Sequence, residues 1–141
     1  MSNINAVNPV IFKGWVKDML CSALRGGHYV KGEGALRRRH YSQAYKDGHE
    51  DRYCVMGVLC NISPRSRWIQ MRRSVGTGGR PVNAYSWNSI HGNVCLNFPT
   101  EEVLRWAVES GPMGKLAELS ALNDSKTMTF PQMAKLIEEE F

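Results

Sequence analysis

Residues 53–60 read Tyr53-Cys54-Val55-Met56-Gly57-Val58-Leu59-Cys60, and every one of them except Gly57 is apolar, aromatic or thiol-bearing. By periodicity alone, a run of this length fits a buried helix or a buried strand. We favour a helix, because Asp51 is placed to cap its start and Asn61 with Ser63-Pro64 is placed to end it. Gly57 inside a helix costs about 1 kcal/mol relative to Ala unless a close contact requires it. We therefore expect another helix to cross at Gly57.

Residues 8–25 carry a second helical pattern. Asn8-Pro9 suits a helix start, since Asn is a good cap and Pro is tolerated in the first turn. Arg25-Gly26-Gly27 suits the end, with a cation in the last turn and Gly free to adopt a left-handed conformation. Between them, apolar residues recur every three to four positions and predict one buried stripe. These residues are Ile11, Trp15, Val16, Met19, Leu20, Ala23 and Leu24.

The C-terminal third predicts three more helices. The first starts at residues 99–102, with Thr100 as cap and two acids in the first turn, and Gly111-Pro112 ends it. A short helix follows through Leu116, Leu119 and Leu122, and Asn123-Asp124 forms a turn whose side chains bond to local backbone. The last helix begins with a capping box formed by Thr129 and Gln132.

The remaining segments lack a helical pattern. Residues 28–52 contain Gly32 and Gly34 and predict a loop or a short, poorly anchored helix. Residues 68–71 and 82–87 alternate partly with period two around the turn-forming residues 76–81, which favours a β-hairpin over a long loop. We therefore predict a mainly α fold, a small domain of about four to five helices with a β-hairpin or long loop insertion around residues 65–90.

Length and composition predict a single domain over residues 1–141. At 141 residues and 43% hydrophobic content the chain can bury one core. It contains no apolar run of the roughly 18–20 residues that span a membrane. The first residues, Met1-Ser2-Asn3-Ile4-Asn5, lack the basic start and apolar stretch of a secretory signal. We expect a protein of the cytoplasm with no membrane association.

Charge is distributed unevenly along the chain. Residues 1–99 carry 14 Lys/Arg and 5 Asp/Glu, a balance of +9, whereas residues 100–141 carry 4 and 8, a balance of −4, which together give the net charge of +5. The excess of basic residues in residues 1–99 indicates an anionic partner. The alternatives are a solvated surface, or contact between the two regions within the fold or in a homo-oligomer.

The cysteines and histidines do not predict a metal site or a cofactor. The four cysteines form no Cys-x-x-Cys pair, and His28, His40, His49 and His91 are scattered without ligand spacing. Disulfides are not expected either, because cytosolic thiols stay reduced.

Three segments resemble small uncharacterised proteins of bacteriophages and prophages. They are Tyr-Cys-x-x-Gly-Val-Leu-Cys at residues 53–60, the Pro-containing start of a Glu-Glu-Val helix with Trp at residues 99–106, and Leu-x-x-Leu-Asn-Asp before the final helix at residues 119–137. The similarity begins earlier, at residues 15–24 and 31–36, and covers roughly half the chain. It implies a phage or prophage origin and carries over no catalytic residue. Residues 37–52 look longer than the usual connection in that family.

Cys54 is the strongest candidate for a catalytic residue. A thiol near a helix N-terminus can have a lowered pKa, and His91 could act as its base with Asn88 or Asn93 orienting the ring. Cys54 nevertheless lies in an apolar run, and free cysteines are commonly small buried hydrophobes. The structural role is therefore the preferred interpretation, and an enzyme is not favoured.

Arginine and aromatic side chains provide the candidate ligand site. Guanidinium groups bind phosphate in a bidentate manner, and aromatic rings stack on bases, so the combination suits a nucleic acid or a nucleotide. The alternative is ordinary surface Arg with Trp68 and Trp87 covering the hairpin. No helix-turn-helix, phosphate-binding loop or Rossmann fingerprint is present. The candidate residues are Arg37, Arg38, Arg39, Arg65, Arg67, Trp68, Arg72, Arg73, Arg80, Tyr85 and Trp87.

These patterns and the resemblance lead to one functional expectation with two alternatives. The expectation is a non-enzymatic phage protein that binds a host target during infection, in host takeover or anti-defence, through a basic Arg/Trp surface that recognises nucleic acid or a nucleotide. The first alternative is an inhibitor that binds a host protein, either a host enzyme or a defence complex. The second is a cysteine-dependent hydrolase that uses Cys54 and His91.

Overall fold

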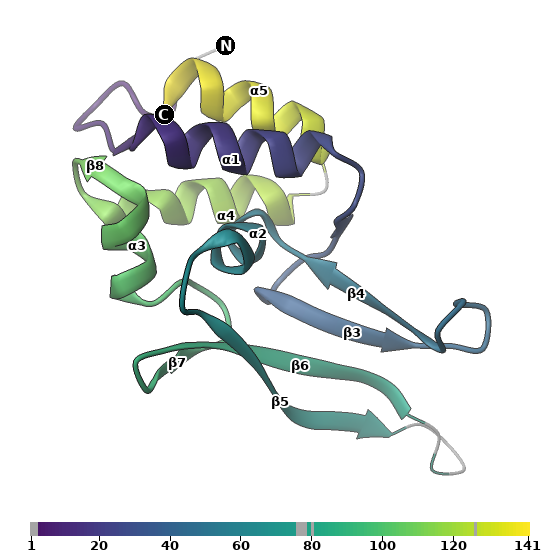
Figure 1. Cartoon of the computed structure of the whole chain (residues 1–141). Helices are drawn as coiled ribbons and strands as arrows, with labels where there is room; N and C mark the ends of the chain where they lie inside the picture. Colours follow the sequence, from purple (N-terminus) through teal and green to yellow (C-terminus); the bar gives the residue numbers. More distant parts are fainter. Residues whose placement is uncertain (1–2, 76–78, 80, 126) are drawn as a thin grey trace.

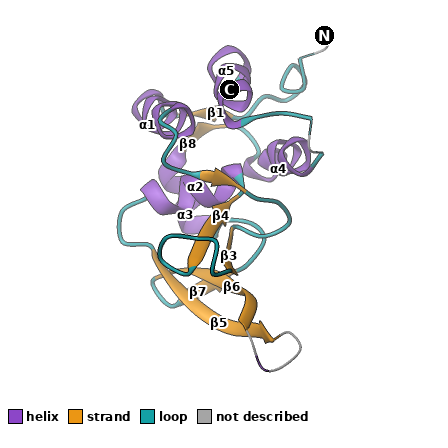
Figure 2. Cartoon of the chain, turned by 90° about the vertical axis from the view of Figure 1, so that its right-hand side faces the viewer, coloured by secondary structure: helices purple, strands orange, loops and turns teal. Residues whose placement is uncertain are grey.

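The computed structural model describes residues 3–75, 79, 81–125 and 127–141. Within them, five α-helices form a layer on one side of the molecule and a mixed β-sheet forms the other side (Figure 1). The view at right angles shows the same division, with the helices at one end and the strands of the large sheet at the other (Figure 2). The helices are α1 (Gly14–Arg25), α2 (Val55–Ile62), α3 (Glu101–Ala107), α4 (Ala117–Asp124) and α5 (Phe130–Glu140), with a short 3-10 helix at Met113–Leu116.

The large sheet has the strand order β2-β4-β3-β6-β5, and β7 also pairs with β6. The β2 and β4 strands run parallel, whereas the other neighbours are antiparallel. Two short strands near the chain ends, β1 and β8, form a separate antiparallel pair. The strands are β1 (Ile11–Phe12), β2 (Val30–Lys31), β3 (Arg37–Tyr41), β4 (His49–Tyr53), β5 (Arg67–Val75), β6 (Pro81–Ile90), β7 (Asn93–Cys95) and β8 (Val108–Ser110).

The predicted mainly α fold is wrong, because the chain is about 40% helix and 25% strand with a mixed six-stranded sheet. The largest error lies in residues 28–52, predicted as a loop or a poorly anchored helix, which contain β2, β3 and β4. Both β3 and β4 consist of half-buried polar and aromatic residues, so they lack the apolar alternation that marks a strand. The hairpin predicted around residues 65–90 is present as β5 and β6, but it belongs to this sheet and is not an insertion into a helical domain.

The α1 helix starts later than predicted and buries a different side. It begins at Gly14, and the main chain before it pairs as β1 with β8. Its buried residues are Val16, Leu20, Cys21 and Leu24, which pack toward α5 and α2. Of the predicted stripe, Trp15 is 54% exposed and Met19 is 40% exposed. Both sides of this helix are apolar in sequence, and the neighbouring helices cover only one.

The apolar run at residues 53–60 forms α2, which lies between the outer helices and the sheet (Figure 1). Its cap is Cys54, whose sulfur accepts a hydrogen bond from the Gly57 N–H, and not the predicted Asp51. The expected helix crossing at Gly57 is also wrong. The group that lies against Gly57 is the main chain of Leu36, just before β3, and a Cβ at Gly57 would be 1.8 Å from the Leu36 carbonyl oxygen.

The helix caps in the C-terminal third are confirmed. The Thr100 side chain accepts from the Val103 N–H, and Thr129 and Gln132 form both hydrogen bonds of the capping box. Two details differ from the prediction: α3 ends at Ala107 and continues as β8, and Asn123 lies within α4 with no exposed surface. The Asn123 side chain bonds to distant main-chain groups, accepting from the Val55 N–H and donating to the Gly32 carbonyl. It thereby connects α4, α2 and the segment after β2.

Among the described residues, none of the helices has the length and apolarity needed to cross a membrane.

Candidate functional site

Strand alternation divides the basic cluster of β3 between the two faces of the sheet. Residues directly opposite on neighbouring strands share a face, so Arg37, Arg39, Asp51 and Tyr53 point to one side. That side is the inner face, which contacts α2: Trp68 lies on it and donates its indole N–H to the Asn61 side chain of α2. The opposite side, which we call the outer face, carries Arg38, His40, Glu50, Arg52, Arg67, Ile69, Tyr85 and Trp87.

On the inner face, one carboxylate binds two arginines. Asp51 accepts from Arg37 Nη2 at 2.6 Å and from Arg39 Nε at 2.8 Å. Desolvation acts to raise the pKa of Asp51, but the hydrogen bonds and charges of Arg39 and Arg37 outweigh it and hold that pKa below its usual value. The Arg37 guanidinium also lies over the rings of Tyr53 and Trp68, at 5.5 and 5.4 Å from their centroids. The side chains of Arg37 and Arg39 therefore bind groups of the fold itself.

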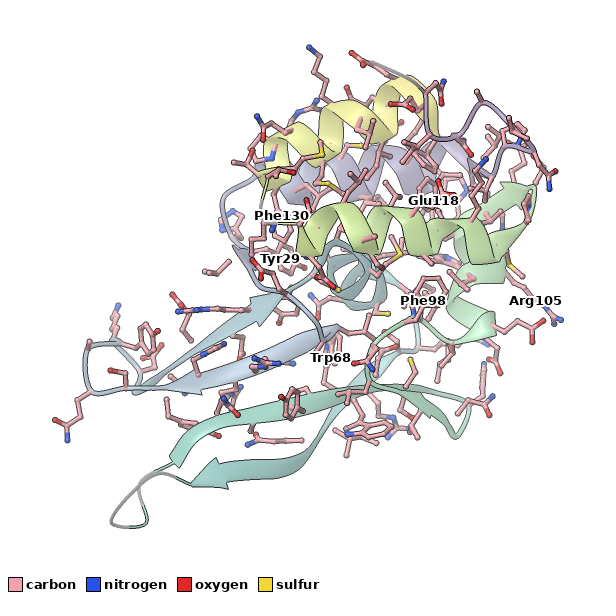
Figure 3. The ribbon with its side chains drawn as sticks, turned by 180° about the vertical axis from the view of Figure 1, so that it is seen from behind. Tyr29, Trp68, Phe98, Arg105, Glu118 and Phe130 are labelled. Carbon is pink, nitrogen blue, oxygen red and sulfur yellow. The ribbon has the colours of Figure 1, made fainter. Side chains whose placement is uncertain are left out.

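These contacts also show that the sheet curls around its inner face. In a flat sheet, β4 and β5 would be about 14 Å apart, because β3 and β6 lie between them. The rings of Tyr53 and Trp68, one from each strand, are nevertheless 6.0 Å apart. Trp68 lies on the side of the sheet that faces the helices (Figure 3). The outer face is turned away from the helical layer.

The outer face brings two arginines and an aromatic ring together in one row. Arg38 on β3 lies opposite Arg52 on β4 and opposite Tyr85 on β6. The Arg38 guanidinium lies 4.6 Å from the centroid of the Tyr85 ring, and its Nη2 donates to the Tyr85 hydroxyl at 3.1 Å. Arg52 donates to Glu50 at 2.9 Å and to the hydroxyl of Tyr45 at 2.9 Å. Like charges directly opposite on adjacent strands repel, and the bond of Arg52 to Glu50 offsets part of the repulsion between Arg38 and Arg52.

Beyond Tyr85, aromatic and apolar side chains of β6 and β5 extend the outer face. Trp87 is two residues beyond Tyr85 on β6 and therefore on the same face, opposite Ile69 of β5, which is 37% exposed. Arg67, exposed at the start of β5, is also on this face. The outer face therefore combines guanidinium groups with two aromatic rings, a composition that suits phosphates and bases.

A cavity of about 250 Å³ opens beside the Arg38–Arg52 pair. One wall is the segment after β2, which approaches β4 closely at Gly32, where a Cβ would be 2.8 Å from the Cβ of Arg52. Burial lowers the pKa of His40 and the charges of Arg52 and Arg38 lower it further, with Glu50 acting in the opposite sense. The local potential at His40 is therefore positive. The lining residues are Lys31, Gly32, Glu33, Ala35, Arg38, His40 and Arg52.

The predicted ligand residues are thus only partly brought together. Arg38, Arg67, Tyr85 and Trp87 share the outer face, whereas Arg37, Arg39 and Trp68 are on the inner face. Arg65 is exposed in the connection between α2 and β5, with a positive φ of 65°. The side chains of Arg72 and Arg73, and the whole of Arg80, lie outside the described residues.

The proposed catalytic pair has other partners. Cys54 is buried, and burial raises the pKa of its thiol to about 11, which is opposite to the change that a nucleophile needs. His91 is in the turn between β6 and β7, with its Nε2 3.4 Å from a carboxylate oxygen of Glu102. Among the described residues, no group of three or more His, Cys, Asp or Glu side chains could hold a metal ion.

Two residues of the site, His40 and Arg52, were not predicted from the sequence. A signal was present, because Arg38 and His40 in one segment and Glu50 and Arg52 in the other each recur with period two. Once these segments are taken as paired strands, the four side chains fall on one face.

The chain has no match among protein families, curated proteins or solved structures.

Proposed function

We propose that this protein binds a single-stranded nucleic acid or a nucleotide on the outer face of its sheet. The observation that carries the proposal is the row formed by Arg52, Arg38 and Tyr85 on three neighbouring strands. Two guanidinium groups offer charge-assisted hydrogen bonds to phosphate oxygens. The ring next to them offers a surface on which a base can stack.

The spacing of the aromatic residues favours unpaired bases. Tyr85 and Trp87 are two residues apart on β6, which places them about 6.8 Å apart along one face. Rings in this arrangement can stack on successive bases of an extended strand. In a duplex the base faces already stack on one another, so they are not accessible to such a surface.

Anisotropy of a fluorescent single-stranded oligonucleotide, measured over a range of salt concentrations, tests the proposal and separates its two components. Arg38→Gln should weaken binding and reduce the slope of log Kd against log salt by about 0.7, the effect of one lost phosphate contact on a single strand. Trp87→Ala should weaken binding by about 1–3 kcal/mol with an unchanged slope, because stacking releases no counterions.

Arg105→Gln and Trp15→Ala are the matched controls. Arg105 is on α3 and projects away from the sheet (Figure 3), and Trp15 is on α1 in the helical layer. Both should leave affinity and salt slope unchanged. The proposal fails if the wild-type protein binds neither the oligonucleotide nor a nucleotide at low salt, or if the control variants weaken binding as much as the outer-face variants.

The setting we propose is the interior of a bacterial host cell during phage infection, where the ligand would be a host or viral nucleic acid or nucleotide. This setting rests on the sequence resemblance to phage proteins. Host takeover and suppression of antiviral defence both fit a small binding protein of this kind.

A host protein is the second candidate ligand. The observation that favours it is the exposed pair Trp15 and Met19 on α1, with the Trp15 ring packed edge-on against Trp106 at 5.6 Å. Capture from nuclease-treated host lysate separates the two candidates, since a protein partner survives the nuclease and is lost in Trp15→Ala. A nucleic-acid ligand gives the opposite result on both counts.

A further inference from the structure

We propose that the cavity beside Arg38, His40 and Arg52 is a subsite for a phosphate monoester, such as the terminal phosphate of an oligonucleotide or the phosphate of a nucleoside monophosphate. This inference rests on the proposed function and adds a ligand class to it: the protein would favour phosphorylated ends over internal phosphodiesters.

The size of the cavity supports a single phosphate group. Its volume is about 250 Å³. That is below the roughly 300–1,000 Å³ of clefts that hold drug-sized ligands and leaves room for a phosphate group. The segment after β2 forms one wall and β3 and β4 form the other. A terminal phosphate can enter such a space alone, whereas an internal phosphodiester would have to bring nucleotides on both of its sides.

The arginines of the cavity retain donors for an anion. Lys31 also lines the cavity, but its side chain is on the inner face with Tyr53, and its Nζ donates to the Asn123 carbonyl of α4 at 2.6 Å. The bonds of Arg52 to Glu50 and Tyr45 involve Nε and Nη2, which leaves its other N–H groups. Arg38 bonds to Tyr85 through Nη2, and its Nε is buried without a hydrogen-bond partner. A buried N–H of this kind is costly unless a ligand or water satisfies it.

Protonation of His40 would change the charge of the cavity from one that suits a monoanion to one that suits a dianion. The charged groups that act on His40 are the cations Arg52 and Arg38 and the acid Glu50. With His40 neutral these charges sum to about +1, and protonation of His40 would raise the sum to about +2. A phosphate monoester has its second pKa near 6, so it is mostly dianionic at neutral pH, whereas a phosphodiester carries one charge.

Binding of the monoester is therefore coupled to protonation of His40. In the free protein the pKa of His40 is lowered, first by burial and then by Arg52 and Arg38, so the neutral ring is favoured. A bound dianion raises that pKa, because it favours the imidazolium. Affinity for the monoester should increase as the pH falls from 8 to 6.5, a range in which the charge of a diester does not change.

The test compares two oligonucleotides of one sequence, with and without a terminal phosphate, bound to the full-length protein at pH 6.5 and pH 8. Forms phosphorylated at the 5′ end and at the 3′ end are both measured. We expect one of them to bind at least about tenfold tighter than the unphosphorylated oligonucleotide at pH 6.5, with a smaller ratio at pH 8. His40→Asn should remove the pH dependence of the ratio, and inorganic phosphate should compete only with the phosphorylated form. Arg105→Gln should change neither.

The outcomes separate this inference from the proposed function. If phosphorylated and unphosphorylated oligonucleotides bind equally and Trp87→Ala weakens both, the subsite is wrong and the nucleic-acid face stands. If oligonucleotides do not bind but a nucleoside monophosphate binds in a His40-dependent manner, the subsite stands and the extended single-strand surface is wrong. If neither class of ligand binds, both proposals are overturned.

Discussion

Gly57 of α2 lies directly against the main chain of Leu36, the residue that precedes β3. A Cβ at Gly57 would be 1.8 Å from the Leu36 carbonyl oxygen and 2.7 Å from its carbonyl carbon. The same main chain accepts a hydrogen bond from the Cys54 N–H at 3.3 Å, just before α2. This contact holds the start of β3 against the buried helix α2. Arg38 is two residues further along β3, so the contact also fixes the position of Arg38 on the outer face.

Gly57→Ala should therefore destabilise the protein by about 1–3 kcal/mol, the usual effect of forcing an added methyl into a packed contact. Helix propensity acts in the opposite direction and favours Ala by about 1 kcal/mol. Urea unfolding followed by circular dichroism measures the difference. The matched control is Gly14→Ala in α1, where nothing lies within 4 Å of the added Cβ. The control should be neutral or stabilising, and equal effects at the two glycines would contradict the close contact.

Asp51 should contribute stability that depends on pH. Desolvation acts to raise its pKa, but the hydrogen bonds from Arg39 and Arg37 lower it below the ordinary value of 3.8. A carboxylate with a lowered pKa stabilises the fold above its unfolded-state pKa and loses that contribution as the pH falls through the folded-state pKa. Asp51→Asn should cost about 2 kcal/mol at pH 7, because two half-buried guanidinium groups lose their partner.

The difference between wild type and Asp51→Asn should then narrow as the pH falls below about 4. Unfolding free energies measured from pH 7 to pH 2.5 test this. Glu101→Gln is the control, since Glu101 forms an exposed pair with Arg105 one helical turn away, and such pairs contribute less than about 0.5 kcal/mol. A difference between wild type and Asp51→Asn that stays constant over the whole pH range is inconsistent with the proposed pairing.

The helices were largely predictable because their signals are local. Thr129 and Gln132 are three residues apart and form the capping box without help from the rest of the chain. The face that α1 buries was not predictable, because Trp15 and Met19 are as apolar as Val16 and Leu20. Only the positions of α5 and α2, which pack on one side of α1, decide between the two stripes.

The strands β3 and β4 were missed because their stabilising partners are distant in sequence or charged. Arg37–Tyr41 contains three arginines in succession, and its inner-face members are buried through Asp51 and Tyr53 on β4 rather than through apolar side chains. The composition of the candidate site was only partly predicted for a related reason. The cluster Arg37, Arg38 and Arg39 looked like one patch, but strand alternation turns Arg38 away from the other two.

The four cysteines should be slow to react in the folded protein. Burial raises the pKa of Cys21, Cys54 and Cys95 to about 11 and that of Cys60 well above its usual value of 9.0. A thiol with a pKa near 11 carries about 100-fold less thiolate at pH 8 than one with a pKa near 9, and alkylation follows the thiolate.

Iodoacetamide labelling at pH 8, read by peptide mass spectrometry, should therefore be about 100-fold slower in native than in unfolded protein. Cys95 should be modified first, because it is the least buried of the four. Rapid labelling of native Cys54 would favour the hydrolase alternative.

The central claim, that the outer face of the sheet binds the ligand, is tested most directly by a nuclear magnetic resonance titration of the protein with a single-stranded oligonucleotide. The four tryptophans sample separate parts of the fold, since Trp87 is on the outer face, Trp68 on the inner face, and Trp15 and Trp106 in the helical layer. We predict that the indole signal of Trp87 and the side-chain signals of Arg38 and Arg52 shift on titration while those of Trp15, Trp68 and Trp106 stay in place. Shifts at Trp15 and Trp106 with Trp87 unchanged would contradict the claim and move the binding surface to the helices.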